Sequence, residues 1–169
     1  MKLYLDMDEV VADWRGFAVK YLRSPELAAG DWLPDQTWRR LKSAQRMFRD
    51  LELKAGAEDL VKYCLNLYRS AKIEGLYFLT AIPHNNDLPF AAYDKVLWAQ
   101  YYFPGIPVFI GPYSEDKQQR CAPGDVLIDD RAVNCDQWIQ AGGRAHQYKT
   151  WELCEPWLDQ QFYSGEDAQ

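Results

Sequence analysis

The chain has 169 residues, of which 48% are hydrophobic, 26% charged and 15% aromatic, so it can bury the core of one globular domain. Its formal charge of −6 and its pI near 4.9 exclude a surface built to bind a nucleic-acid backbone, because that binding needs a basic stripe. No apolar run approaches the ~20 residues of a membrane-spanning helix, and no signal peptide precedes the first strand, so we expect a cytoplasmic protein.

Five short apolar runs predict β-strands along the chain. They are residues 2–7 (KLYLDM), 75–81 (GLYFLTA), 106–111 (IPVFIG), 125–130 (DVLIDD) and 144–149 (RAHQYK). Helical patterns separate most of these runs. The alternation predicts an α/β fold with a Rossmann-like parallel sheet and helices on both of its faces.

Three helices are predicted between the strands, at residues 57–72, 93–103 and 134–143. The first is expected to bury one face, which consists of Leu60, Val61, Cys64, Leu65 and Tyr68. The third is expected to end at the glycine pair 142–143, because glycine readily adopts the left-handed conformation that closes a helix.

One segment breaks the alternation. Residues 17–55 contain helical or irregular stretches and no strand signal, although a crossover between parallel strands needs only about a dozen residues. We therefore expect a small helical cap inserted after the first strand, within a single domain spanning residues 1–169, whose last six residues are frayed.

Polar residues follow several of the predicted strands. The first strand ends in Asp6 and Asp8, the second in Thr80, and the fourth in Asp129 and Asp130. Each residue alone has an ordinary structural explanation, such as a helix N-cap or a turn. Together they fall at the carboxyl ends of parallel strands, where open α/β sheets bind their ligands.

A cluster of carboxylates needs a cation. Two unit charges ~4 Å apart repel by about 4 kcal/mol at an effective dielectric constant near 20. The only histidines are His84 and His146, and the four cysteines form no C-x-x-C pair, which argues against zinc and for reduced structural thiols. A site with oxygen ligands alone favours Mg²⁺.

A bound phosphate would complete this arrangement. Lys117, in the connection after the third strand, and the metal would neutralise the phosphate oxygens, and the Thr80 hydroxyl would donate a hydrogen bond. Asp6 would attack phosphorus as the nucleophile, and Asp8 would act as general acid and then as general base. A solvated surface lysine is the structural alternative for Lys117.

These motifs, in this order, resemble the haloacid dehalogenase (HAD) superfamily of phosphatases: DMDEV at residues 6–10, LTA at 79–81, DK at 116–117 and LIDDR at 127–131. More narrowly, the chain is similar to the 5'(3')-deoxyribonucleotidases in DMDEVVADW, in residues 50–63, in YDKVLWAQYYFPG and in GDVLIDDR. The likeness covers residues 3–150. Three positions depart from the family pattern: Glu9 replaces a frequent glycine, Ala81 a frequent serine and Glu115 a frequent basic residue.

The resemblance implies Asp6 as the nucleophile and Asp8 as the acid/base. It implies a Mg²⁺ held by Asp6, the main-chain carbonyl of Asp8 and Asp129, with Asp130 in a supporting role. It further implies Thr80 and Lys117 as phosphate contacts and Lys95 as a contact on the substrate side.

The expected activity is that of a Mg²⁺-dependent phosphomonoesterase acting on deoxynucleoside monophosphates. A phosphatase for another small metabolite and a catalytically silent binding protein remain the alternatives. Trp32 and Trp38 in the cap could stack on a base or pack within the cap. The expected partner is a small nucleotide, without a nucleic-acid polymer or a membrane, and a homodimer is left open.

Overall fold

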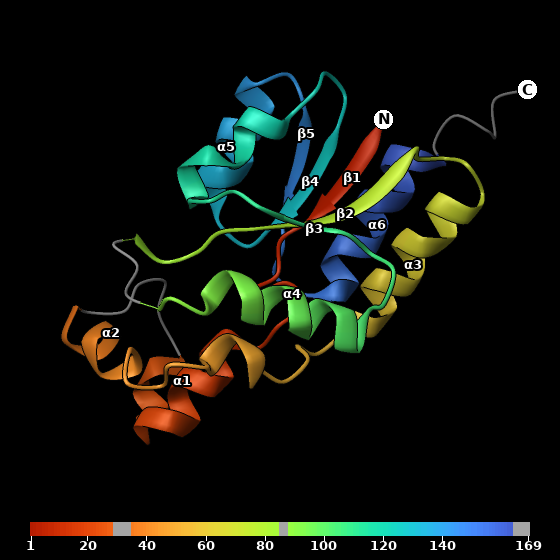
Figure 1. The fold of residues 1–169 in the computed structure, drawn as a ribbon. Coiled ribbons are helices and arrows are strands. Elements are labelled where there is room, and N and C mark those ends of the chain that lie inside the picture. Colours follow the sequence, from red (N-terminus) through yellow and green to blue (C-terminus); the bar gives the residue numbers. More distant parts are fainter. Residues whose placement is uncertain (29–34, 85–87, 164–169) are drawn as a thin grey trace, which may run out of the picture.

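The computed structural model describes residues 1–28, 35–84 and 88–163. Its centre is one five-stranded sheet in the order β3-β2-β1-β4-β5, in which all neighbouring strands are parallel (Figure 1). The strands are β1 (Lys2–Leu5), β2 (Gly75–Thr80), β3 (Val108–Ile110), β4 (Val126–Asp129) and β5 (Arg144–Gln147). All five predicted strands are confirmed, each shorter than its apolar run.

Helices cover both faces of the sheet, as expected for this fold class (Figure 1). They are α3 (Ala57–Arg69), α4 (Ala91–Tyr102), α5 (Ala132–Gln140) and α6 (Trp151–Phe162). Alternate β1 side chains point to opposite faces. Leu3 and Leu5 join the large core with α3, α4 and α6, whereas Tyr4 joins a smaller cluster that contains Trp138 of α5.

The predicted buried face of α3 needs one correction. Tyr68 is 51% exposed, and Leu67 is fully buried in its place. The helical period explains the exchange, because residue 67 lies one and two turns from Cys64 and Leu60 on the same face. Leu60, Val61 and Cys64 are buried as predicted, and Leu65 packs against the same core.

The glycine pair ends α5 as predicted. Gly142 has a φ of 92°, and its N–H donates to Ile139 O while the N–H of Gly143 donates to Trp138 O. These two hydrogen bonds form a Schellman motif, which needs a residue in the left-handed conformation.

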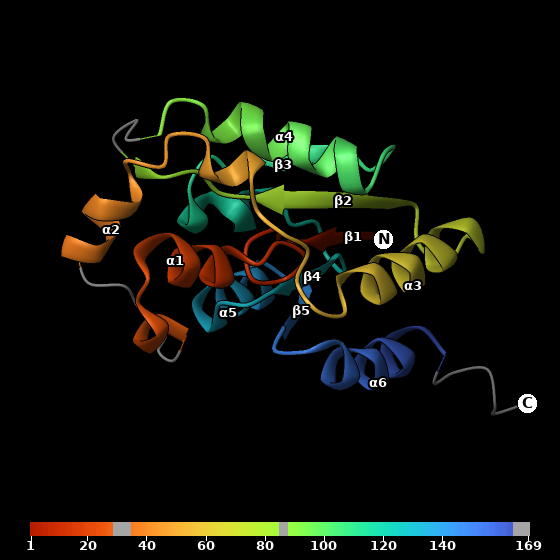
Figure 2. The ribbon, with the colours of Figure 1, turned by 90° about the horizontal axis from the view of Figure 1, so that it is seen from below.

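The described part of the segment expected as a cap consists of helices, turns and irregular stretches, and none of the five strands lies in it. It contains α1 (Trp14–Leu22), α2 (Asp35–Leu41) and two 3₁₀ turns, η1 (Pro25–Ala28) and η2 (Met47–Arg49). Figure 2 shows α1 and α2 on the side of the sheet toward which the β2 arrow points. Ala18, Leu22 and Leu41 form a small core of their own there.

Main-chain hydrogen bonds join the loop that precedes this insertion to the end of the insertion. The N–H of Asp13 donates to Glu52 O, and the N–H of Lys54 donates to Val11 O, both at 2.9 Å. Farther along, the Arg46 guanidinium forms a bidentate pair with Asp94 of α4, whose side chain is 1% exposed. The exit of the insertion is therefore fixed to α4.

In the described ranges, none of the helices has the length and apolarity that a bilayer-spanning segment requires. The four cysteines are free thiols.

Candidate active site

The carboxyl ends of β1 and β4 bring Asp6 and Asp129 to one buried centre. The N–H of Asp6 still donates to Ile128 O, so the sheet fixes its main chain. Its carboxylate is 5% exposed and lies 2.8 Å from the Lys117 ammonium, which also donates to Asp129 Oδ2 at 2.6 Å. Lys117, on the 3₁₀ turn η4 (Ser114–Arg120), is thus buried between two carboxylates rather than solvated.

Asp129 is held from both sides of its carboxylate. The Asn134 side-chain amide donates to Oδ1 and Oδ2 at 2.9 and 3.0 Å, and the N–H of Arg131 donates to Oδ1 at 3.0 Å. Sequence reasoning missed Asn134, which it took only as the start of a helix. The available signal was a polar residue in the first turn of the helix that follows the LIDDR motif.

A second ion pair holds Asp8. The Lys95 ammonium donates to Asp8 Oδ2 at 2.6 Å and to Thr80 Oγ1 at 2.8 Å, and it lies 4.4 Å above the centre of the Phe48 ring. Asp8 Oδ1 is buried and has no hydrogen-bond partner in the described part of the chain. One oxygen of Asp8 is therefore fixed and the other remains available to a ligand.

Three carboxylates lie close enough to share one ion. Oxygen atoms of Asp6, Asp129 and Asp130 all lie within 4.8 Å of one another. Asp8 is the fourth carboxylate of the site. The ammonium groups of Lys95 and Lys117 supply two positive charges. The formal balance of −2 matches one divalent cation, and the all-oxygen donor set suits Mg²⁺.

The pKa values of these groups reflect the crowding. Burial raises the pKa of Asp6 to about 6; Lys117 opposes this shift, while Asp129 and Asp8 add to it. Burial also raises the pKa of Asp130 to about 8, with Asp6 and Asp129 contributing. Burial alone would lower the pKa of Lys117, but attraction to Asp6 and Asp129 outweighs it and raises that pKa.

The other two acidic residues of the amino-terminal motif, Glu9 and Asp13, accept hydrogen bonds from main-chain N–H groups. Asp13 is the N-cap of α1 and accepts a hydrogen bond from the N–H of Gly16 at 2.9 Å. Glu9 has a φ of 61°, in the left-handed region that favours glycine, which accounts for the glycine that is frequent at this position of the family pattern. Its carboxylate accepts from Lys54 at 2.8 Å and from the N–H of Arg15 at 2.7 Å.

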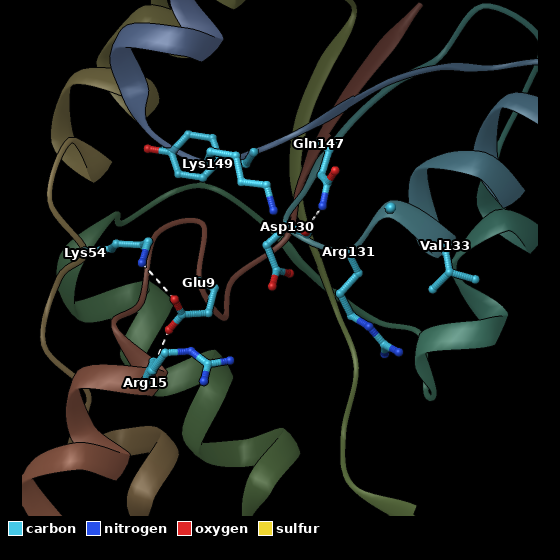
Figure 3. Close-up of a pocket in the computed structure, with 10 residues that line it drawn as sticks. Glu9, Arg15, Lys54, Asp130, Arg131, Val133, Gln147 and Lys149 are labelled. Atoms are coloured by element: carbon cyan, nitrogen blue, oxygen red, sulfur yellow. Dashed lines mark hydrogen bonds and ion pairs between the residues drawn. The ribbon is translucent and has the colours of Figure 1, made fainter. Parts of the chain in front are cut away.

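A cavity of about 440 Å³ adjoins the acidic cluster (Figure 3). We call it the Asp130 pocket, because Asp130 belongs to both. Its lining consists of Glu9, Arg15, Lys54, Asp130, Arg131, Ala132, Val133, Gln147, Tyr148 and Lys149.

The predicted aromatic contacts fall elsewhere. Trp38 packs in the cap, with its ring centre 5.9 Å from that of Trp14, as the packing alternative requires. Trp32 lies outside the described residues. Glu115, 56% exposed, pairs with His84 at 3.2 Å and does not reach the Lys117 centre.

Neither a protein-family model nor a curated protein matches the chain. Solved structures do match it. The chain shares its fold with a hydrolase. That hydrolase, from Streptococcus pneumoniae TIGR4, superposes with a TM-score of 0.54 at 14% identity, covering 94% of this chain and 97% of the other. A putative β-phosphoglucomutase from Thermotoga maritima gives a TM-score of 0.44 at 20% identity, with 91% and 90% covered. The first likeness agrees with the predicted fold class.

Proposed function

We propose that the protein is a Mg²⁺-dependent phosphomonoesterase in which Asp6 is the nucleophile. The observation that carries the proposal is the buried Asp6 carboxylate, which shares the Lys117 ammonium with Asp129. A purely structural ion pair would not also gather Asp130 beside it and leave an oxygen of Asp8 without a partner two residues away. The motif order of the HAD superfamily supports the same assignment.

The metal would be held by the carboxylates of Asp6 and Asp129, by the main-chain carbonyl of Asp8 that the resemblance implies, and by Asp130 at its side. When bound, Mg²⁺ would neutralise phosphate charge and so lower the barrier to attack by an anion. Lys117 would contribute positive charge on the same side, and the Thr80 hydroxyl would orient the phosphate.

The chain's own residues then carry out two displacements. An Asp6 oxygen forms a bond to phosphorus while the ester P–O bond breaks, and Asp8 gives its proton to the departing alkoxide. Asp8 next takes a proton from water, whose oxygen attacks phosphorus and breaks the Asp6–phosphate bond. Inorganic phosphate leaves, and both aspartates return to their starting states. Lys95 holds Asp8 in place throughout.

Deoxynucleoside monophosphates are the proposed substrates, following the narrower resemblance to 5'(3')-deoxyribonucleotidases. The support is in the sequence motifs alone, because Trp38 packs inside the cap and Trp32 lies outside the described residues. Another small phosphometabolite would use the same centre, and fold alone does not decide between them.

Replacement of the nucleophile tests the proposal. Asp6→Asn keeps the shape of the side chain but cannot attack phosphorus, so Mg²⁺-dependent hydrolysis of p-nitrophenyl phosphate should fall at least about a hundredfold. Asp136→Asn, the same change at an exposed position of α5, is the matched control and should retain full activity. Retention of more than about a tenth of the activity by Asp6→Asn would refute the assigned mechanism.

A further inference from the structure

The Asp130 pocket gathers positive charge on a chain whose formal charge is −6. Four basic side chains line it, against two acidic ones, and they come from separate parts of the sequence. Arg15 follows the β1 loop, Lys54 lies at the exit of the cap, Arg131 follows β4 and Lys149 follows β5. The fold, and not a local run of basic residues, brings them together.

Most of this positive charge has no carboxylate partner among the residues that the structure describes. Glu9 is already neutralised by Lys54, and Asp130 belongs to the acidic cluster beside the nucleophile. Arg15 Nη1 donates to the carbonyl of Leu27 at 3.0 Å, and Arg131 Nη1 donates to a serine hydroxyl, so both contacts are to neutral groups. Lys149 is exposed and has no ion-pair partner within the described ranges.

The three side chains line the same space. Figure 3 shows the Lys149 ammonium directed toward Asp130 and the Arg15 guanidinium extending toward the same region from the side of Glu9, whereas the Arg131 guanidinium is turned away from Asp130 and donates to the Ser114 hydroxyl. Like charges that face one cavity repel, and an anion placed among them removes that repulsion while it gains charge-assisted hydrogen bonds. Arg15 and Arg131 each offer a planar guanidinium, which suits carboxylate and phosphate groups.

We infer that the substrate carries a second anionic group, a carboxylate or a phosphate, on the alcohol side of its phosphomonoester. The Asp130 pocket binds this group through Arg15, Arg131 and Lys149 while the ester phosphate lies at Asp6. This inference rests on the proposed function, because Asp130 adjoins the reaction centre only if Asp6 is that centre. Within the proposed activity on deoxynucleotides, it predicts that a deoxynucleoside 3',5'-bisphosphate has a higher kcat/KM than the corresponding monophosphate.

Two matched pairs of compounds test the inference. Thymidine 3',5'-bisphosphate has one phosphate more than dTMP. In the second pair, 3-phosphoglycerate has a carboxylate where glycerol 3-phosphate has a hydroxymethyl group. The readout is the ratio of kcat/KM within each pair for the wild-type protein, for the Arg131→Gln/Lys149→Gln double variant and for Lys62→Gln. Lys62 is an exposed lysine of α3 outside the pocket, so its variant removes charge without touching the lining.

The wild-type protein should prefer the doubly anionic member of at least one pair by about tenfold or more, as expected for charge-assisted hydrogen bonds. The pair that shows the preference identifies the second anion. The double variant should bring that ratio close to one, and Lys62→Gln should leave it unchanged. Higher salt should weaken the preference, because these side chains are partly exposed.

A ratio near one in both pairs for the wild-type protein would overturn the inference and leave the proposed function intact. A preference that survives in the double variant would overturn it as well. If neither these four compounds nor p-nitrophenyl phosphate is hydrolysed, the proposed function fails. Calorimetric titration of the four compounds into the protein in the presence of Mg²⁺ then decides the inference separately. Tighter binding of the doubly anionic compounds would then support it, and equal binding would overturn it.

Discussion

At the scale of single residues, four carboxylates crowd the first thirteen positions and the structure divides them into two pairs. Asp6 and Asp8 face buried ammonium groups at the sheet edge, whereas Glu9 and Asp13 accept hydrogen bonds from main-chain N–H groups near α1. Their spacing predicted the carboxylate cluster. Which carboxylates face the buried ammonium groups and which accept main-chain hydrogen bonds depends on the left-handed conformation of Glu9. The sequence alone did not indicate this conformation.

Asn134 offers a residue-scale test of how the site is positioned. Asn134→Ala removes both hydrogen bonds to the Asp129 carboxylate, so the apparent affinity for Mg²⁺ should fall about ten- to a hundredfold, the usual effect of losing such a support. The measurement is activity as a function of Mg²⁺ concentration. Asn66→Ala, on the exposed face of α3, is the control. An unchanged Mg²⁺ dependence in Asn134→Ala would contradict the role of Asn134 in positioning Asp129 as a ligand.

The backbone at Glu9 gives a second residue-scale prediction. Glu9→Ala and Glu9→Gly both lose the contacts to Lys54 and Arg15, but only alanine pays the steric cost of a φ of 61°. Glu9→Gly should therefore be the more stable of the two by about 1 kcal/mol in urea unfolding. An alanine variant as stable as the glycine variant would mean that residue 9 does not hold this conformation.

At the scale of elements, the sequence predicted the strands well and the last helix not at all. The apolar runs of β1, β2 and β4 are bounded by turn residues, which makes their type and order readable. Helix α6 contains Pro156, which lowers helical propensity, and only Cys154 and Leu158 are buried on it. The Arg46–Asp94 ion pair could not be predicted from the sequence either, because 48 positions separate the two residues.

The contact between β5 and α6 predicts a dependence of stability on pH. His146 of β5 lies 5.1 Å from the Trp157 ring, its Nε2 has no partner in the described residues, and burial lowers its pKa. The unfolded chain thus binds a proton at a higher pH than the folded one, so His146 disfavours folding as pH falls below about 6.5.

His146→Phe removes this titrating group. The free energy of unfolding should therefore fall less between pH 7 and pH 5 in the variant than in the wild type. The difference between the two proteins isolates His146 from carboxylates that titrate in the same range. Identical pH profiles in urea unfolding would contradict the lowered pKa of the half-buried His146.

At the scale of the whole molecule, the fold places a helical cap and an acidic centre at the same edge of the sheet. Parallel strands made the convergence of Asp6, Thr80 and Asp129 predictable, because their carboxyl ends share one edge. The ion pairs that link Lys95 to Asp8 and Lys117 to Asp6 were not predictable in detail, since they depend on the packing of α4 and η4. The proposed function depends on the transfer of the phosphoryl group to Asp6.

Trapping the phosphorylated protein tests that claim most directly. In Asp8→Asn the base that activates water is missing, so a phosphoryl group should accumulate on Asp6 after incubation with Mg²⁺ and p-nitrophenyl phosphate, whose p-nitrophenolate leaves without a proton from Asp8. Acid quenching, pepsin digestion and mass spectrometry should locate one phosphoryl group on Asp6, and the Asp6→Asn/Asp8→Asn double variant should carry none. A phosphoryl group on another residue, or none on Asp8→Asn while the wild type is active, would contradict the assignment of Asp6 as the nucleophile.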